Sequence, residues 1–193
     1  MNYLAIDTST DICSVSLYND SKYKTLVEKG VKDHSEYLPV FVEKLLKNNS
    51  IKIDFIALNI GPGSFTGLKV GSSFSKGLAM ALNIPIVPVK SFDALSIDIS
   101  LDCYYIAIYS HRDFSFNTYY KKGVENILKC DKISNLNGHK VFGYGFPEHL
   151  NVKYDEVKPC SEKIGLIGLK QYELYKNKSI NDINPIYLMQ KSD

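Results

Sequence analysis

The chain has 193 residues, of which 45% are hydrophobic, and this is enough apolar material for one globular domain or two small lobes. A net charge of +2, with Arg112 as the single arginine, disfavours a protein that reads bases or clamps many phosphates. None of the four cysteines belongs to a C-x-x-C pair, and no segment reaches the roughly 20 apolar residues of a membrane span, so we expect reduced thiols in a cytoplasmic protein.

The first hundred residues combine short apolar runs with segments of helical spacing. A long helix is expected after Asp33, where Glu36 completes a capping box, although Pro39 leaves open a regular start at Pro39 itself. A second helix ends near Leu82, and a short helix covers 91–99. The expected strands are 3–6, 13–18, 23–28, 53–60 and 84–87.

A glycine-proline turn, G-P-G-S, separates the fourth strand from the second helix, and Ser64 or Thr66 can cap that helix. Small side chains then recur at every fourth position and form one nearly flat ridge on the helix. The members of this ridge are Gly67, Gly71, Ser75 and Ala79. Because glycine inside a helix costs roughly 1 kcal/mol relative to alanine, the ridge indicates close approach of another backbone, from this chain or from a partner.

The second half repeats the order of elements without repeating the sequence. Its expected strands are 103–109, 114–120, 124–128 and 140–143, and its expected helical segments are a short one around Ile133, 146–150 and 161–175. Two β-β-β-α-β-α units predict a duplicated ribonuclease-H-like α/β fold, the class of actin, Hsp70 and sugar kinases. We expect an N-terminal lobe at 1–100 and a shorter C-terminal lobe at 101–193.

Five short motifs resemble the TsaB (YeaZ) family. They are L-A-I-D-T-S-T at Leu4–Thr10, C-S-V-S-L at Cys13–Leu17, H-S-E-Y-L-P at His34–Pro39, G-P-G-S-F-T-G-L-K at Gly61–Lys69 and P-I-Y-L at Pro185–Leu188. The resemblance is strong in the first hundred residues and thin between 110 and 180. Lys69 stands where the family usually has arginine, so a bidentate contact is not expected there.

The resemblance implies a non-catalytic partner of the transferase TsaD, which works with the ATPase TsaE. Together they install threonylcarbamoyl on adenosine 37 of tRNAs that read codons starting with A. It also implies that the two N-terminal helices contact TsaD, or a second copy of this chain in a homodimer, and that contact with tRNA is indirect. The residues expected at this interface are His34, Glu36, Leu38, Phe41, Val42, Leu45, Gly67, Lys69, Gly71 and Ser75.

The residues themselves complete no catalytic set. The related transferase binds its metal through two histidines four positions apart, whereas His34 is followed at that spacing by Leu38, so we expect no metal site. Asp7, Thr8 and Ser9 stand where actin-type folds hold phosphate and magnesium, although hydrogen bonding of Asp7 to local turn amides is the favoured interpretation.

Two interpretations of the function therefore stand at this point. The first is a scaffold subunit without a cofactor of its own, with ATP or ADP and magnesium entering only in the assembled complex. The alternative is a small actin-like ATPase or kinase that uses Asp7 and the G-P-G-S turn.

Overall fold

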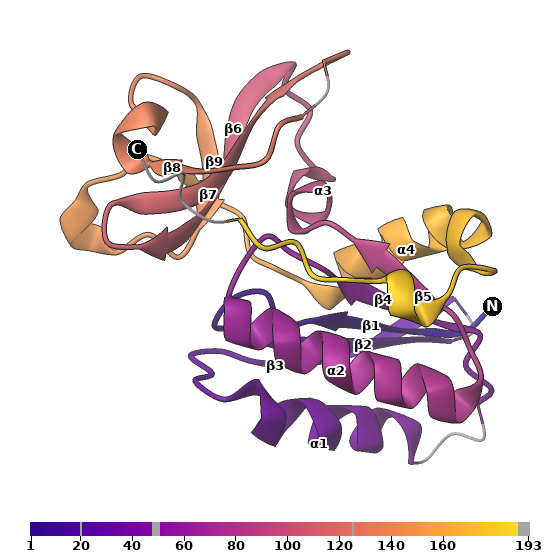
Figure 1. Cartoon of the computed structure of the whole chain (residues 1–193). Helices are drawn as coiled ribbons and strands as arrows, with labels where there is room; N and C mark the ends of the chain where they lie inside the picture. The colour runs from indigo at the N-terminus through magenta and orange to yellow at the C-terminus, as the bar shows by residue number, and fades with distance from the viewer. Residues whose placement is uncertain (20, 48–50, 125, 189–193) are drawn as a thin grey trace. The chain divides into compact units, whose positions relative to one another are not determined.

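The chain forms two compact units (Figure 1). The computed structural model describes residues 1–19, 21–47, 51–124 and 126–188. The first unit comprises Met1–Ala94 and Pro159–Ile186, and the second is built on Leu95–Lys158. The sequence predicted a second lobe at 101–193, but helix α4 (Ser161–Tyr175) packs on the sheet of the first unit, so the last part of the chain returns to the N-terminal lobe.

The first unit contains a five-stranded sheet in the order β3-β2-β1-β4-β5. Its strands are β1 (Tyr3–Asp7), β2 (Cys13–Asn19), β3 (Lys22–Glu28), β4 (Phe55–Asn59) and β5 (Ile86–Val89). The first three strands form an antiparallel meander, and β4 and β5 run parallel to β1. Ile6 lies opposite Val15 on one side and Leu58 on the other. Every residue of β1 and β4 is buried, as expected of strands covered on both faces.

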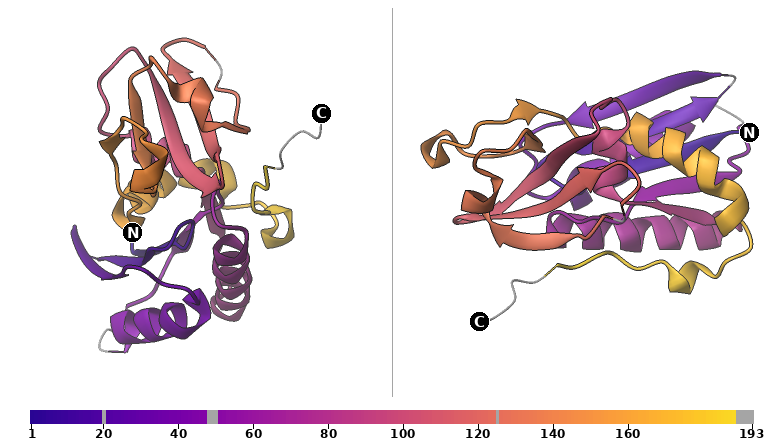
Figure 2. Two further views of the ribbon diagram at one scale, coloured as in Figure 1. Left: turned by 90° about the vertical axis from the view of Figure 1, so that its left-hand side faces the viewer. Right: turned by 90° about the horizontal axis from the view of Figure 1, so that it is seen from above.

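Helices cover both faces of this sheet. Helices α1 (His34–Leu46) and α2 (Phe65–Leu82) lie side by side on one face, and α4 covers the other (Figures 1 and 2). Helix α1 begins at His34, because the Asp33 carboxylate caps it by accepting a hydrogen bond of 2.8 Å from the Ser35 amide. The helix then continues through Pro39. The start predicted at Asp33 is therefore confirmed, and the later start at Pro39 is wrong.

Two glycines bring α4 unusually close to the sheet. A Cβ atom added at Gly168 would lie 2.6 Å from the Cβ of Ala57, and one at Gly165 would lie 2.7 Å from the Tyr3 ring. Neither distance is compatible with ordinary packing, so larger residues at these positions would push the helix outward.

A chain of buried hydroxyl groups fixes the first turn of α4. The Ser161 hydroxyl lies 2.6 Å from the hydroxyl groups of both Ser14 and Ser16 on β2. The Ser16 hydroxyl also lies 2.8 Å from the Thr25 hydroxyl, and the Thr25 hydroxyl donates a hydrogen bond of 2.5 Å to a carboxylate oxygen of Glu162. These contacts satisfy polar groups that would be costly to bury without partners.

The second unit contains a sheet in the order β10-β9-β6-β7-β8. Its strands are β6 (Cys103–His111), β7 (Phe114–Lys121), β8 (Lys129–Lys132), β9 (Val141–Tyr144) and β10 (Asp155–Glu156). Counted from the first strand of each unit, both sheets have the order third, second, first, fourth, fifth. The duplicated ribonuclease-H-like fold predicted from the order of elements is therefore confirmed.

The connections of the second unit are shorter than predicted. The segments around Ile133 and 146–150 form single 3₁₀ turns, η1 (Ile133–Leu136) and η2 (Glu148–Leu150). The third strand is β8: Val124 and Ile127 are 57% and 69% exposed and neither lies in a strand, while residue 125 of the strand expected at 124–128 lies outside the described residues.

Other boundaries differ less. The short strand expected at 84–87 is β5, two residues later, and α3 (Ser91–Ser96) is shorter than the helix expected at 91–99. A further 3₁₀ turn, η3 (Ile180–Asp182), follows α4. The Ile186 amide then donates a 2.7 Å hydrogen bond to the carbonyl of Ile60, just after β4.

Candidate functional site

A buried polar cluster links the ends of β1 and β4 to the start of α3, and we call it the Asp7 cluster. One carboxylate oxygen of Asp7, Oδ1, accepts hydrogen bonds from the Ser9 amide at 3.0 Å, the Ser9 hydroxyl at 2.7 Å and the Asn59 side-chain amide at 2.9 Å. The Asn59 carbonyl oxygen, Oδ1, accepts from the Gly61 amide and the Ser91 hydroxyl, both at 2.8 Å. Three separate segments of the first unit thus share one network.

Burial dominates the electrostatics of this cluster. Asp7 is 1% exposed, and loss of hydration raises the pKa of its carboxyl group above the ordinary value. The hydrogen bonds from Ser9 and Asn59 and the nearby His34 act in the opposite direction on the same pKa. The network therefore stabilises a carboxylate that has been taken out of water, and Asp7 bonds to a local turn amide as the sequence interpretation favoured.

The glycine turn packs closely against the residues that follow β1. The Ser64 amide donates to the carbonyl of Ser9 at 2.7 Å, and a Cβ atom at Gly63 would overlap that same carbonyl oxygen. Gly61 has a φ of +100°, a conformation that glycine adopts readily. Thr8 and Ser9, which with Asp7 belong to the nucleotide contact of the alternative interpretation, are 0% and 1% exposed.

The small-residue ridge of α2 packs against the end of β1 in the same chain. A Cβ atom at Gly67 would overlap the carbonyl oxygen of Thr8, and one at Gly71 would overlap the Thr8 hydroxyl. That hydroxyl donates a 2.8 Å hydrogen bond to the carbonyl of Gly67. Of the two explanations for the ridge, the structure supports close approach of the chain's own backbone.

His34 is a structural residue of the same region. It is 5% exposed, and its Nε2 atom donates to the carbonyl of Thr10 at 2.8 Å, since a carbonyl oxygen can only accept. Its other ring nitrogen, Nδ1, is buried without a hydrogen-bond partner among the described residues. Leu38, one helical turn on, belongs to the hydrophobic core.

The structure places most of the residues predicted at the partner interface inside the first unit. Eight of the ten expected residues are buried within the first unit: His34, Leu38, Phe41, Val42, Leu45, Gly67, Gly71 and Ser75. The apolar stripe of α1 faces the unit's own core, and only Glu36 and Lys69 are exposed. An amphipathic helix shows the same sequence pattern whether it covers its own sheet or a partner.

A different side of α2 is exposed, and we call it the outer face of α2. It comprises Phe65, Lys69, Ser73, Gly77 and Met80. Phe65 and Met80 are 56% and 71% exposed, and the Lys69 ammonium group lies 5.0 Å from the centre of the Phe65 ring. Apart from the backbone of its own helix and its chain neighbours, no atom of the described residues lies within 4 Å of a Cβ placed on Gly77, so those residues give this glycine no packing role. The sequence feature that could have indicated this face is Gly77, a glycine inside the helix that is not part of the buried ridge.

The residues that the structure describes contain neither a cluster of metal ligands nor a membrane-spanning helix. Within that part of the chain, no group of three or more His, Cys, Asp and Glu side chains is arranged to hold a metal ion. In the same residues, no helix is both long enough and apolar enough to cross a membrane.

Comparisons with known proteins connect the first half of the chain to tRNA modification. A family model described as TsaD, tRNA N6-adenosine threonylcarbamoyltransferase, matches residues 21–109. The Haemophilus influenzae protein named tRNA threonylcarbamoyladenosine biosynthesis protein TsaB is 31% identical over 99 residues, which are 50% of this chain and 42% of that protein. The Escherichia coli protein of the same name is 34% identical over 94 residues, 47% of this chain and 41% of that protein.

The structural comparison extends over nearly the whole chain. The match to the structure of YeaZ from Pseudomonas aeruginosa includes 97% of this chain and 99% of YeaZ, with a TM-score of 0.75 and 22% sequence identity. A Pseudomonas aeruginosa protein described as similar to peptidase YeaZ has the same coverage, a TM-score of 0.78 and 23% identity. The sequence matches span less than half the length of the TsaB relatives. The first half of the chain is thus similar in sequence to proteins named TsaB, and the whole chain has the fold of the Pseudomonas aeruginosa YeaZ structures.

Proposed function

We propose that this protein is a non-catalytic subunit of the machinery that makes threonylcarbamoyladenosine in tRNA, and that it binds a TsaD-type transferase through the outer face of α2. The names of the TsaB relatives assign those proteins to the biosynthesis of threonylcarbamoyladenosine in tRNA, and this supports the pathway proposed here. In this proposal the protein acts in the cytoplasm as a scaffold or activator, a TsaE-type ATPase is the third component, and tRNA is contacted through the partner.

The single observation that carries the partner role is the composition of the outer face of α2. Phe65 and Met80 expose large apolar side chains, while Ser73 and Gly77 between them leave the helix backbone accessible. Glycine at an exposed interior position of a helix costs roughly 1 kcal/mol relative to alanine, and no close contact to the other residues that the structure describes offsets that cost. Small residues flanked by apolar anchors suit a closely packed second helix.

The match to the transferase family supports a partner of similar fold. The matched segment, 21–109, contains both α1 and α2. A transferase built on the same fold would present a similar pair of helices, and two such pairs can pack against each other. Val40 on α1 is 42% exposed and adds apolar surface to that helix.

The closed Asp7 cluster supports the non-catalytic part of the proposal. A catalytic carboxylate has to reach its substrate, whereas Asp7 is enclosed and bonded to Ser9 and Asn59. We therefore propose that the isolated chain has no resident cofactor, and that ATP or ADP with magnesium enters only with the assembled complex.

Replacing Met80 by Asp tests the interface, because the change puts a charge at the C-terminal end of the outer face of α2 without touching the core. Leu174→Asp is the matched control, since Leu174 is 67% exposed on α4, which lies on the opposite side of the sheet. We expect Met80→Asp to weaken binding to the host's TsaD-type protein at least about tenfold, as replacing an apolar anchor by a charge does. Calorimetric titration gives both dissociation constants.

Three results would contradict the proposal. One is unchanged affinity of a folded Met80→Asp variant, and another is equal weakening by Leu174→Asp. The third is turnover of ATP by the isolated chain that disappears in an Asp7→Asn variant, which would establish the ATPase alternative. A homodimer through the same face would have twice the mass of one chain. Met80→Asp would return it to the monomer mass, and the transferase would displace one copy of the chain.

A further inference from the structure

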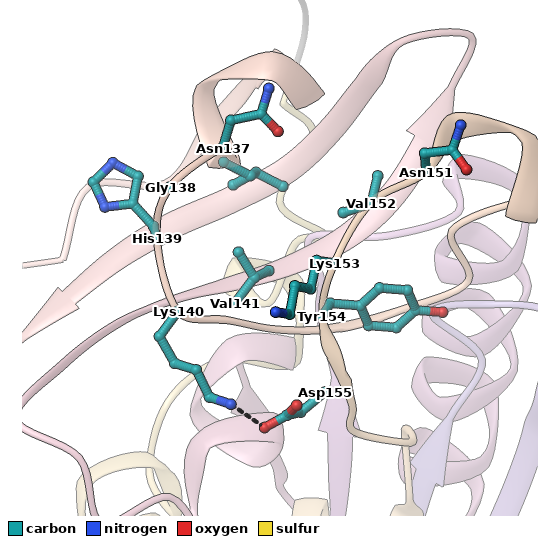
Figure 3. A pocket seen from close by; sticks show the side chains of 11 residues that line it. Asn137, Gly138, His139, Lys140, Val141, Asn151, Val152, Lys153, Tyr154 and Asp155 are labelled. Atoms are coloured by element: carbon teal, nitrogen blue, oxygen red, sulfur yellow. Dashed lines mark hydrogen bonds and ion pairs between the residues drawn. The ribbon is translucent and has the colours of Figure 1, made fainter.

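The loop 137–140 forms one side of the pocket drawn in Figure 3, and it contains Asn137, the single asparagine in the sequence that glycine follows. The loop joins η1 to β9, and every residue in it is exposed. Asparagine is thermolabile, because the amide nitrogen of the next residue can attack its side-chain carbonyl carbon. Glycine hinders this attack least, since it has no side chain and adopts more backbone conformations than other residues.

The hydrogen bonding of the loop bears on both groups that would react. Within the residues that the structure describes, neither the Gly138 amide nor the Asn137 side-chain amide has a hydrogen-bond partner. The neighbouring amides are engaged, since that of Asn137 donates to the carbonyl of Ser134 at 3.2 Å and that of His139 donates to the carbonyl of Leu136 at 3.3 Å. Apart from its chain neighbours, no atom of the described residues lies within 4 Å of a Cβ placed on Gly138. The attacking group therefore has room to move.

The backbone conformation of Asn137 sets the pace of the reaction. Asn137 is extended, with a φ of −61° and a ψ of 137°, so the Gly138 nitrogen does not face the side-chain carbonyl carbon. A rotation about the Cα–C bond has to bring the two atoms together before they can react. Gly138 has a φ of +78°, and glycine accepts the change in backbone angles that this rotation requires. We therefore expect the folded chain to react, but more slowly than the unfolded chain, in which the rotation is free.

We propose that Asn137 is a site of spontaneous deamidation, and that the reaction converts the second unit into a less stable form. The Gly138 amide nitrogen loses its proton to hydroxide and bonds to the side-chain carbonyl carbon of Asn137. The bond from that carbon to its NH₂ group breaks, and the group leaves as ammonia with a proton from water. Water then opens the cyclic imide at either carbonyl carbon, so the residue becomes aspartate or isoaspartate. Nothing is oxidised or reduced, and the site does not depend on the proposed transferase partner.

Isoaspartate in this loop would disturb the start of β9. In isoaspartate the side-chain methylene becomes part of the main chain, so the loop gains one backbone atom. The loop joins two core residues, Leu136 and Val141, which are each 2% exposed. The hydrogen bond from His139 to Leu136 spans the altered residue, and the carbonyl of Lys140 accepts a 2.8 Å hydrogen bond from the Tyr105 amide on β6. The longer loop should therefore loosen η1 and the first pairing of β9 with β6.

Mass spectrometry of the full chain, incubated at mildly alkaline pH and then digested with trypsin, tests the proposal. Cleavage after lysine yields Ile133–Lys140, which contains both Asn135 and Asn137, and Val141–Lys153, which contains Asn151. We expect a gain of about 1 Da, the replacement of NH₂ by OH, at Asn137 alone. The other two asparagines are also exposed but precede larger residues, so they are internal controls. The same incubation in urea should convert Asn137 faster.

Two substitutions separate the roles of the reacting residues. Asn137→Gln should abolish the mass gain at this position, because glutamine would have to close a larger ring. Gly138→Ala should slow the reaction at least about tenfold, since a side chain beside the attacking nitrogen restricts the rotation that ring closure needs. Gly123→Ala is the matched control, because Gly123 has nearly the same φ, +79°, and equally open surroundings among the described residues.

Hydrogen exchange reports the structural consequence independently of mass. We expect faster exchange of the Tyr105 amide in the deamidated chain than in the fresh chain. An unmodified Asn137 in the folded chain, once the chain in urea has been converted, would overturn the proposal. Equal mass gains at Asn135 or Asn151, or equal slowing by Gly123→Ala, would also overturn it. Unchanged exchange at Tyr105 after conversion would refute the loss of stability.

Discussion

The same substitution at two glycines of α2 should change stability in opposite directions. Gly77→Ala adds a methyl group where no atom lies within 4 Å. Gly67→Ala adds it where it would overlap the carbonyl oxygen of Thr8, which is backbone and cannot turn away. Both variants gain the same intrinsic helix propensity, so the difference between them isolates the packing of the buried ridge against the end of β1.

The expected magnitudes follow from these surroundings. Gly77→Ala should raise the free energy of unfolding by about 0.5–1 kcal/mol, the propensity difference between alanine and glycine. Gly67→Ala gains that amount, but overpacking costs about 1–3 kcal/mol. Displacing Thr8 also weakens its 2.8 Å hydrogen bond to Gly67, worth about 1 kcal/mol. The net expectation for Gly67→Ala is a loss of about 1–3 kcal/mol.

Urea unfolding followed by circular dichroism measures both changes. With a slope of about 2 kcal/mol per molar urea, the two midpoints should lie about 1–2 M apart, on opposite sides of the wild-type midpoint. Equal slopes in the three proteins would show that the same structure unfolds in each. Midpoints that shift in the same direction by the same amount would refute the packing of Gly67 against Thr8.

Three further predictions concern other parts of the chain. Because burial raises the pKa of Asp7, the folded state keeps a proton that the unfolded state releases, so the stability contributed by this group falls as pH rises from about 4 through the raised pKa. Asp7→Asn should flatten that fall in a series of urea midpoints against pH, and an unaltered slope would contradict the assignment. Ser161→Ala should cost about 1–3 kcal/mol, because it leaves the hydroxyl groups of Ser14 and Ser16 without their shared partner; thermal unfolding within error of wild type would show that water replaces it. Ile127→Lys should change the free energy of unfolding by less than about 0.5 kcal/mol, since Ile127 is 69% exposed. A large loss of stability would show that Ile127 is part of the core.

Local patterns in the sequence were enough to predict the duplicated fold. The alternation of apolar runs with turn residues located the three strands of the first meander and the first two strands of the second, and the Asp33 cap located the start of α1. They failed where the local signal was ambiguous. The apolar run containing Val124 and Ile127 resembles a strand, but the pairing of Asn117 with Lys129 places the strand after it.

The buried polar groups were predicted only in part. Asp7 was recognised because it ends a strand at a turn, but Asn59 and Ser91 were missed. Each is an ordinary residue at the edge of its own element. They become one network only because β1 and β4 are neighbours in the sheet and the chain after β5 returns to the same edge. Distance along the chain hides such a network.

Most of the helices and strands could be predicted from the sequence alone, because hydrophobic periodicity and capping act over a few residues. It also showed that α2 needs a close neighbour on its ridge of small residues. Only the tertiary structure decided that this neighbour is Thr8 of the same chain, and that α4 returns to the first sheet instead of completing the second unit. The physical reason is that a small or apolar helix face records the need for burial, while the identity of the covering surface depends on contacts between residues far apart in the chain.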